Sequence, residues 1–382
     1  MEPLDPISII YYRPDALRVW TYPEIKERLS WYYEVMKDLK PAKFIIAKHI
    51  ESPINPYRKD LSIEDLWKIH RDLEKEFRKT WLSIKNGEQK LGSKRPEYSF
   101  LDVKIAIVKR MLRECSFCEW RCRVDRTSGK KGVCRLDATT YVDTYFHHMG
   151  EEAPLVPSGT IFYGGCNFRC VFCQNWTISQ ANPYAGIIVD AQKLASIQEE
   201  LRRSGARNIN HVGGDPTPNL HTILESLKYL EINVPQLWNS NMYLTREAMD
   251  LLKDVIDIWL PDFKYGNNKC AQRLSVIRNY YDIVTRNLKI AYENGDMIIR
   301  HLVLPSHIEC CTKRVLEWIS KNTPRAIVNI MDQYRPDYLV LRMPKRFKEI
   351  ARRPSLTELR NAYSYARKYG FSKCPEELCF KE

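Results

Sequence analysis

Between residues 158 and 331, short apolar segments alternate with amphipathic segments, and this alternation constrains the fold more than any other feature of the sequence. The apolar segments predict strands at residues 160–163, 208–213, 234–239, 256–261, 297–304 and 326–331. The amphipathic segments predict helices at residues 190–204, 220–230, 245–253, 280–293 and 312–321. Strands joined by helices form right-handed βαβ units and a parallel sheet. The sequence therefore predicts an α/β fold with a partial (β/α)6 TIM-like barrel, whose functional residues follow the carboxyl ends of the strands.

Three further segments are predicted around this barrel, which spans residues 141–340. Residues 1–98 predict a helical N-terminal extension, with helices at 23–40 and 62–85 and a polar linker at 86–96. Residues 99–140 combine a helix at 100–113 with four closely spaced cysteines. Residues 341–382 predict a basic C-terminal tail with a helix.

The composition excludes several classes of protein. Apolar residues make up 44% and charged residues 28% of the 382 positions, which excludes a disordered or collagen-like chain. The sequence has no apolar run long enough to span a bilayer, and its first thirty residues do not resemble a secretory signal. Twelve cysteines in such a chain are typical of metal ligands or reactive thiols rather than disulfides. We therefore expect a reduced, cytoplasmic protein.

The positive charge is concentrated in two segments. The formal net charge is +13; residues 101–140 hold 10 basic and 5 acidic residues, and residues 341–382 hold 11 and 5. Such segments could contact RNA or another acidic macromolecule, or could form a solvated surface. No membrane partner is expected.

Three cysteines directly after the first predicted barrel strand carry the strongest chemical signal. Cys166, Cys170 and Cys173 have the spacing C-x3-C-x2-C. Three thiolates on one loop can bind three irons of a 4Fe–4S cluster and leave the fourth iron open, whereas a closed cluster uses four. A zinc site with a distant fourth ligand is the alternative, but it does not explain the aromatic Phe172 before the last cysteine.

A second motif follows the next strand. Gly213 and Gly214 permit the close approach of a ligand to the backbone, and the acidic Asp215 can pair with an ammonium group. The alternative is an ordinary glycine-rich turn. Polar residues also follow or end the later strands, including Asn239 and Lys264.

These motifs resemble the radical S-adenosylmethionine (SAM) superfamily, whose signature is C-x3-C-x-aromatic-C. The segments SGTIFYGGCNFRCVFCQN, NINHVGGDPTPN, WNSN, LPDFKYGN, IIRHLVLP and MDQYRP are similar to the pyruvate formate-lyase activating-enzyme-like group, in particular its PflX-type branch. This resemblance implies a radical SAM oxidoreductase with a 4Fe–4S cluster, SAM and a reductant such as ferredoxin or flavodoxin.

The resemblance also implies roles for individual residues. Cys166, Cys170 and Cys173 are the implied cluster ligands, and Phe172 is expected beside the adenine of SAM. Gly213, Gly214 and Asp215 match the motif that holds the methionine amino group. Lys264 and Arg300 match catalytic residues near SAM, and Asn239 stands where activases often have an acidic residue.

A second cysteine group precedes the barrel. Cys115, Cys118, Cys122 and Cys134 are spaced C-x2-C-x3-C-x11-C, which indicates a shared metal, either zinc or a second iron–sulfur cluster. The roles of Cys310 and Cys311, after the fifth strand, stay open between a substrate-facing thiol and helix packing. Cys270, Cys374 and Cys379 are expected to be inert thiols.

The function predicted from the sequence is reductive cleavage of SAM to a 5′-deoxyadenosyl radical, which abstracts hydrogen from a macromolecular substrate, as in activation of a glycyl radical enzyme. The alternatives are a radical enzyme that modifies RNA or a small molecule, and a non-catalytic iron–sulfur protein.

Overall fold

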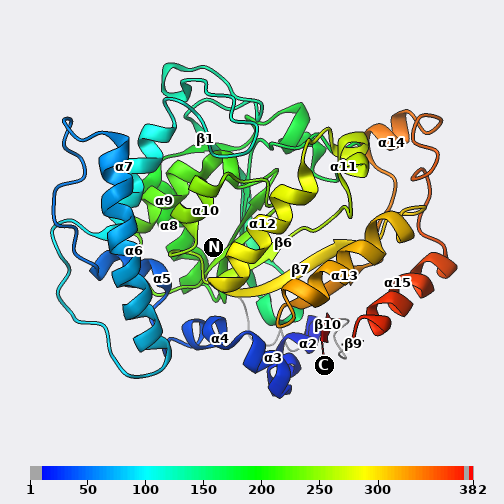
Figure 1. The fold of residues 1–382 in the computed structure, drawn as a ribbon, viewed down its shortest axis with the longest axis horizontal. Coiled ribbons are helices and arrows are strands. Elements are labelled where there is room, and N and C mark those ends of the chain that lie inside the picture. Colours follow the sequence, from blue (N-terminus) through cyan, green and yellow to red (C-terminus); the bar gives the residue numbers. More distant parts are fainter. Residues whose placement is uncertain (1–10, 374–377, 382) are drawn as a thin grey trace.

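A ten-stranded sheet organises the computed structural model, which describes residues 11–373 and 378–381 (Figure 1). Its centre consists of six parallel strands that neighbour one another in chain order. These are β2 (Ser158–Tyr163), β4 (Asn208–Gly213), β5 (Gln236–Ser240), β6 (Ile258–Pro261), β7 (Asp296–Leu302) and β8 (Ile327–Met331). The predicted α/β fold with a partly open parallel sheet is confirmed.

Four antiparallel strands, which were not predicted from the sequence, extend the sheet on both sides. On one side β1 (Thr140–His148) pairs with β2 and with β3 (Ile187–Val189). On the other side β10 (Leu378–Lys381) pairs with β8 and with β9 (Phe371–Lys373). Much of β1 is exposed or half-buried, so the strand lacks the continuous apolar run that marks the buried parallel strands.

Helices after the parallel strands lie on the outer face of the sheet (Figure 1). They are α8 (Ala191–Arg203), α9 (Leu220–Tyr229), α10 (Arg246–Leu252), α11 (Asn268–Ser275), α12 (Tyr280–Glu293) and α13 (Lys313–Asn322). Side chains cap several of them: Asp190 accepts a hydrogen bond from the backbone N–H of Lys193, and Asn267 accepts one from that of Cys270. These caps satisfy N–H groups that the first helical turn leaves free.

The N-terminal segment is helical, with one correction to the predicted boundaries. Its helices are α2 (Asp15–Arg18), α3 (Pro23–Arg28), α4 (Ser30–Met36), α5 (Lys43–His49), α6 (Ile63–Lys85) and α7 (Phe100–Met111). The single helix predicted at residues 23–40 is wrong, because the chain breaks at Leu29. The carboxylate of Asp296 accepts a hydrogen bond of 2.8 Å from the backbone N–H of Tyr32, in the first turn of α4. This tertiary contact stabilises a helix start that periodicity cannot reveal.

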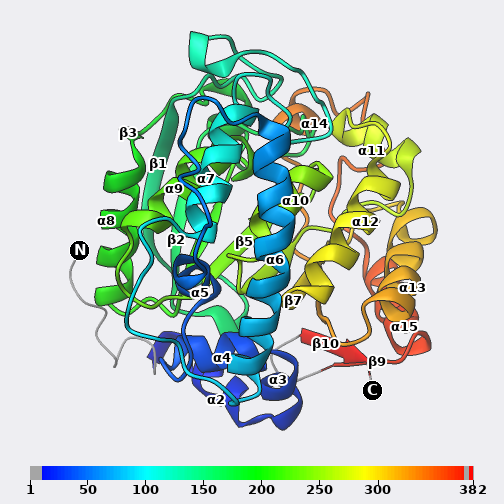
Figure 2. The ribbon, with the colours of Figure 1, turned by 60° about the vertical axis from the view of Figure 1, so that its left-hand side comes forward.

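An apolar cluster joins the N-terminal segment to the inner face of the sheet. Side chains of α3, α4 and the preceding turn pack with residues of β5, β6, β7 and β8. Its members include Val19, Ile25, Leu29, Tyr32, Leu237, Ile258, Leu260, Ile298 and Ile327. Most of these strand residues lie near the amino ends of their strands, so α2, α3 and α4 cover that edge (Figures 1 and 2).

The C-terminal segment contains α14 (Tyr338–Arg342) and α15 (Leu356–Lys368), and α15 lies beside α13. Within the described ranges, helices long and apolar enough to cross a membrane are absent. The predicted inert thiol Cys374 lies outside the described residues.

Candidate functional site

The loop after β2 carries the three predicted cluster ligands. The Cys166 and Cys170 side chains are buried, and that of Cys173 is half-buried. Each sulfur has a hydrogen-bonding neighbour: the Phe168 N–H at 3.3 Å from Cys166, the Ser275 hydroxyl at 2.9 Å from Cys170, and the Ser179 hydroxyl at 3.3 Å from Cys173. Such contacts stabilise thiolates, the form that binds iron.

The three thiols are close enough to influence one another electrostatically. Burial raises the pKa of Cys166 well above its usual value, and the nearby Asp215 and Cys170 raise it further. Burial also raises the pKa of Cys170, to about 12, and that of Cys173. The thiols therefore keep their protons at neutral pH unless a bound metal ion or cluster displaces those protons.

Two other segments hold the loop in place. The backbone N–H groups of Arg169 and Val171 donate to the carbonyls of Ser275 and Leu274, at 3.1 and 2.9 Å. These two carbonyls belong to the end of α11. On the other side, the Leu339 N–H of α14 donates to the Val171 carbonyl at 2.9 Å. The loop is thus clamped between α11 and the C-terminal segment.

Phe172, expected beside the adenine of SAM, packs against the connection between β8 and α14. It is 5% exposed, and its ring meets that of Tyr334 edge to face, with 5.7 Å between the centroids. Tyr334 therefore fixes the orientation of the Phe172 ring, a contact that the sequence analysis does not include.

The glycines after β4 allow two loops to approach each other closely. A Cβ atom on Gly214 would lie 2.1 Å from the Gly165 carbonyl oxygen. Gly213 has φ +117°, and a Cβ there would lie 2.1 Å from the backbone nitrogen of Tyr163. Because only glycine avoids both conflicts, the motif brings Asp215 directly against the cysteine loop.

Asp215 is buried and bridges the ends of β4 and β5. Its carboxylate accepts hydrogen bonds of 3.0 Å from the backbone N–H groups of Thr217 and Asn241. Burial raises its pKa, although these bonds and Lys264 oppose that shift. Among the residues that the structure describes, Asp215 has no salt-bridge partner, and such a buried carboxylate is suited to accept an ammonium group of a ligand.

Two asparagines on β5 and the loop after it face this region differently. Asn239 is 4% exposed, and its Nδ2 has no hydrogen-bond partner among the residues that the structure describes. Asn241 donates from Nδ2 to the Asn167 Oδ1 at 2.6 Å and lies 3.9 Å from the Cys166 sulfur. Asn241 is visible in the sequence as the last polar residue of the WNSN segment, but that position gave it no predicted role in the site.

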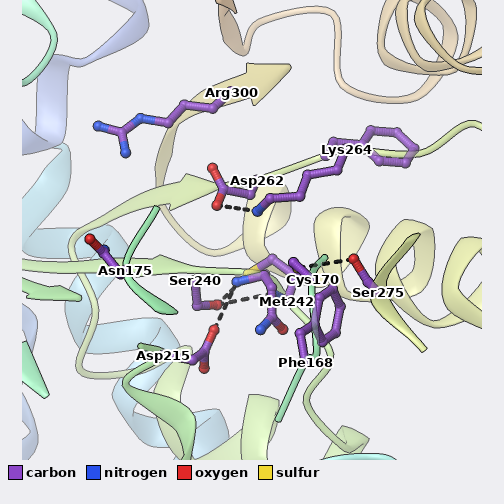
Figure 3. A network of polar contacts seen from close by, with 12 residues as sticks. Phe168, Cys170, Asn175, Asp215, Ser240, Met242, Asp262, Lys264, Ser275 and Arg300 are labelled. Atoms are coloured by element: carbon purple, nitrogen blue, oxygen red, sulfur yellow. Dashed lines mark hydrogen bonds and ion pairs between the residues drawn. The ribbon is translucent and has the colours of Figure 1, made fainter. Parts of the chain in front are cut away.

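Lys264 lies on the loop after β6 and pairs with Asp262 (Figure 3). Burial by itself lowers the pKa of Lys264, but Asp262 and Cys170 outweigh it and hold the pKa above its usual value. The ammonium therefore stays charged on the cysteine side of the sheet, where it can bind a carboxylate.

Arg300 stands apart from Lys264, and in Figure 3 its side chain extends away from Lys264 and Cys170. It pairs with Glu151 and Glu152, with 2.7 Å between its Nε and the Glu152 Oε1. Asn210 of β4 and Asn329 of β8 donate to the same two carboxylates, at 2.9 and 2.8 Å. The structure thus places Arg300 in a polar network inside the barrel.

Glu151 and Glu152 were missed because they precede β2, on the connection from β1, rather than following a strand. Burial by itself raises the pKa of Glu151, but Arg300 and His148 hold it at about 2. The Glu151 carboxylate therefore remains charged, and together Glu151 and Glu152 hold the guanidinium of Arg300 in one orientation.

The upstream cysteines gather beside the first loop. The sulfurs of Cys122 and Cys134 both lie within 3.5 Å of the Cβ position that a side chain at Gly132 would occupy. A hydrogen bond between Cys115 and Cys122 lowers the pKa of Cys122 to about 5 and raises that of Cys115. Cys118 is close enough to Cys134 and Cys122 for both to raise its pKa, after burial.

Direct contacts join this upstream group to the cluster loop. The Trp120 indole N–H donates to the Asn167 carbonyl at 2.8 Å. A Cβ on Gly165 would lie 3.1 Å from the Cys134 carbonyl oxygen. The two predicted metal sites are therefore neighbours.

The donor set at the carboxyl ends of β2, β4, β5 and β6 fits an iron–sulfur cluster with SAM. Three free thiols lie on one loop, and the buried carboxylate of Asp215 and the ammonium of Lys264 are close enough to shift the pKa values of Cys166 and Cys170. Asn239, in β5, adds an amide without a partner in the described ranges. Thiolates suit iron, and the other three groups complement the charged amino-acid part of SAM.

Comparison with known proteins agrees with this chemistry. A family model described as the radical SAM superfamily matches residues 160–319. The uncharacterized protein MJ0674 of Methanocaldococcus jannaschii is 45% identical over 348 residues, which cover 90% of this chain and 98% of the relative. The uncharacterized protein MJ0808 of the same organism is 25% identical over 185 residues, 47% of this chain and 54% of the relative.

Among solved structures, SuiB of Streptococcus suis bound to its precursor peptide SuiA has a TM-score of 0.38 at 18% identity, with coverage of 53% of this chain and 43% of SuiB. TYW1 with a lysine–pyruvate adduct also has a TM-score of 0.38, at 12% identity, with coverage of 58% and 80%.

Proposed function

Since the chain belongs to the radical SAM superfamily, we propose that it binds a 4Fe–4S cluster through Cys166, Cys170 and Cys173 and uses SAM to abstract hydrogen from a macromolecular substrate. When bound and reduced, the cluster supplies the electron that splits SAM into methionine and a 5′-deoxyadenosyl radical. The substrate loses a hydrogen atom, and 5′-deoxyadenosine is the product.

The residues of this chain bind and orient SAM. Asp215 accepts the ammonium group and Lys264 pairs with the carboxylate, so the two charged groups fix opposite parts of the amino acid. Asn239 offers its amide N–H, which has no acceptor within the described residues. The observation that supports the proposal is that Asp215 and Lys264 lie close enough to Cys166 and Cys170 to shift the pKa values of these thiols.

A protein substrate, as in activation of a glycyl radical enzyme, is the first candidate, because the sequence motifs resemble that group. Ferredoxin or flavodoxin would be the reductant. The basic segments 101–140 and 341–382 would contribute to docking an acidic surface of either protein.

An RNA substrate is the second candidate, and one surface feature favours it. Trp176, three residues after Cys173, stacks on Tyr338 with 5.2 Å between ring centroids. The Arg342 guanidinium lies 4.9 Å from the Trp176 ring. Aromatic rings with arginine are typical of surfaces that stack unpaired bases. Retention on RNA that falls steeply with salt would favour this candidate.

The proposal is tested by anaerobic reconstitution followed by reduction with dithionite. We expect SAM to yield methionine and 5′-deoxyadenosine, and the triple variant Cys166→Ala/Cys170→Ala/Cys173→Ala to lose about four irons per chain and all turnover. Deuterium transfer from a labelled substrate into 5′-deoxyadenosine then identifies the substrate. S-adenosylhomocysteine as the main product, or unchanged iron in the triple variant, would contradict the proposal.

A further inference from the structure

A third group of metal-binding side chains lies on two other loops at the same edge of the sheet. Cys270 is in α11, after β6, and His307, Cys310 and Cys311 lie in and just before the turn Ile308–Thr312, after β7. One ligand atom from each of the four residues lies within 4.8 Å of the others. The sequence does not reveal this group, because Cys270 and His307 are far apart in the chain.

The imidazole of His307 faces all three sulfurs. Its Nδ1 lies 3.5 Å from the sulfur of Cys270, 3.4 Å from that of Cys310 and 3.9 Å from that of Cys311. The sulfur of Cys310 lies 3.8 Å from that of Cys270 and 3.9 Å from that of Cys311.

These separations match the edges of a tetrahedron around one zinc ion. Zinc binds thiolate at about 2.3 Å and imidazole nitrogen at about 2.0–2.1 Å, so tetrahedral angles place the sulfurs about 3.8 Å apart and the nitrogen about 3.6 Å from each sulfur. The observed sulfur–sulfur distances of 3.8 and 3.9 Å agree with the first value. The observed nitrogen–sulfur distances of 3.4 to 3.9 Å bracket the second.

We propose that Cys270, His307, Cys310 and Cys311 bind one structural Zn²⁺. Three soft thiolates and one imidazole select zinc over magnesium, calcium or manganese. Four protein ligands fill the tetrahedron and leave no position for substrate, which is typical of a structural site. Binding of the ion releases to solvent the protons that the thiols and the imidazole still carry, so that three thiolates and one neutral imidazole hold the ion.

The surroundings of the four ligands suit a bound cation with thiolates. Asn267 donates from Nδ2 toward the Cys270 sulfur at 3.2 Å and to the Cys310 carbonyl at 2.9 Å. Gly266 lets the two loops meet, because a Cβ there would lie 2.8 Å from the carbonyl oxygens of both Cys310 and Cys311. Cys270 and Cys310 are half-buried, so the ion can enter from solvent.

The ion would stabilise the support of the cluster loop. Cys270 is near the start of α11, and Ser275, at its end, holds Cys170 by its hydroxyl and Arg169 by its carbonyl. A metal that ties the start of α11 to the turn after β7 therefore fixes the helix on which the cysteine loop rests. This is a positioning role, independent of the chemistry proposed above.

Metal analysis of protein purified anaerobically without added iron tests the site. We expect the variant Cys270→Ser/Cys310→Ser to contain one zinc per chain fewer than wild type. The matched control Cys115→Ser/Cys118→Ser should keep this zinc, whichever metal its own group binds. Zinc that is unchanged in the first variant, or iron in its place, would overturn the proposal.

A spectroscopic measurement decides the question even if the first variant does not fold. Zinc X-ray absorption of the Cys115→Ser/Cys118→Ser protein, or of wild type if that variant does not fold, should show sulfur at about 2.3 Å together with nitrogen at about 2.0–2.1 Å. Sulfur ligands alone, absence of zinc, or a disulfide between Cys270 and Cys310 in the anaerobic protein would each refute a three-cysteine, one-histidine site.

Discussion

Replacement of Arg300 by methionine should strongly destabilise the fold, because it leaves two buried carboxylates without their cation. The side chains of Glu151 and Glu152 are 5% and 2% exposed. The pKa of Glu151 is lowered from 4.5 to about 2, which corresponds to about 3 kcal/mol of stabilisation at neutral pH. Removal of one partner of a buried ion pair destabilises a protein by about 3–5 kcal/mol. The pKa shift and this general range therefore give the same magnitude for the loss of stability.

The pH dependence separates this explanation from a simple loss of packing. In wild type the pKa of Glu151 is lower in the folded state, so its contribution to stability is present above about pH 4.5 and is lost as the pH falls toward 2. In Arg300→Met the burial of Glu151 acts without the guanidinium and raises the pKa of the Glu151 carboxyl. Protonation of Glu151 then favours the folded state of the variant. The difference in free energy of unfolding between variant and wild type should therefore be smaller at pH 5.5 than at pH 7.5.

Anaerobic urea unfolding at these two pH values measures both effects. Arg335→Met is the matched control, because the Arg335 side chain is 59% exposed and lies 4.0 Å from Asp337. Its free energy of unfolding should change by at most about 1 kcal/mol. If Arg300→Met has the same free energy of unfolding as the control, or if it loses the same free energy at both pH values, the buried ion pairs of Arg300 do not stabilise the fold.

Three further predictions concern the metal and SAM sites. Asp215→Asn should weaken SAM binding by about 1.5–3 kcal/mol in calorimetry without change in iron content, because it removes a charged acceptor but no ligand. Cys115→Ser/Cys118→Ser should release metal and lower the melting temperature while the cluster at Cys166 still assembles; an unchanged melt with full metal would exclude a metal there. Ser275→Ala should lower the cluster reduction potential by roughly 40 mV in an EPR titration, since it removes a hydrogen bond to the Cys170 thiolate. The control Tyr265→Phe removes a hydroxyl 2.6 Å from that of Ser275 but keeps the Ser275 donor, so it should not lower the potential.

The parallel part of the fold could be predicted from the sequence because its strands are buried on both faces. The strand at Asn208–Gly213 was predicted to the residue, and the other five within three residues at either end. The antiparallel strands β1, β3, β9 and β10 were not found, because three of them are no longer than four residues and the fourth is largely exposed or half-buried. They form on the outer parallel strands: β1 pairs with β2 and β10 pairs with β8.

Residues of the candidate site were predictable where they form a local motif. The spacing of Cys166, Cys170 and Cys173 and the strand-end position of Asp215 are visible in the sequence. Contacts between distant segments are not: Cys270 meets His307 only because consecutive βα loops lie side by side. The partners of Arg300 come from the connection before β2, which the strand-end rule does not cover.

The apolar contact between α3–α4 and the inner face of the sheet limits how this protein can be dissected. The segment that matches the superfamily, residues 160–319, contains neither those helices nor β8. Expressed alone, it would leave Leu260 and Ile298, both fully buried in the whole chain, facing water. Each would forfeit about 1.5–3 kcal/mol of burial free energy. A shortened gene intended to yield the smallest working enzyme should therefore retain the codons of residues 15–36 and 327–331, and a product without them should be recovered mainly as aggregate.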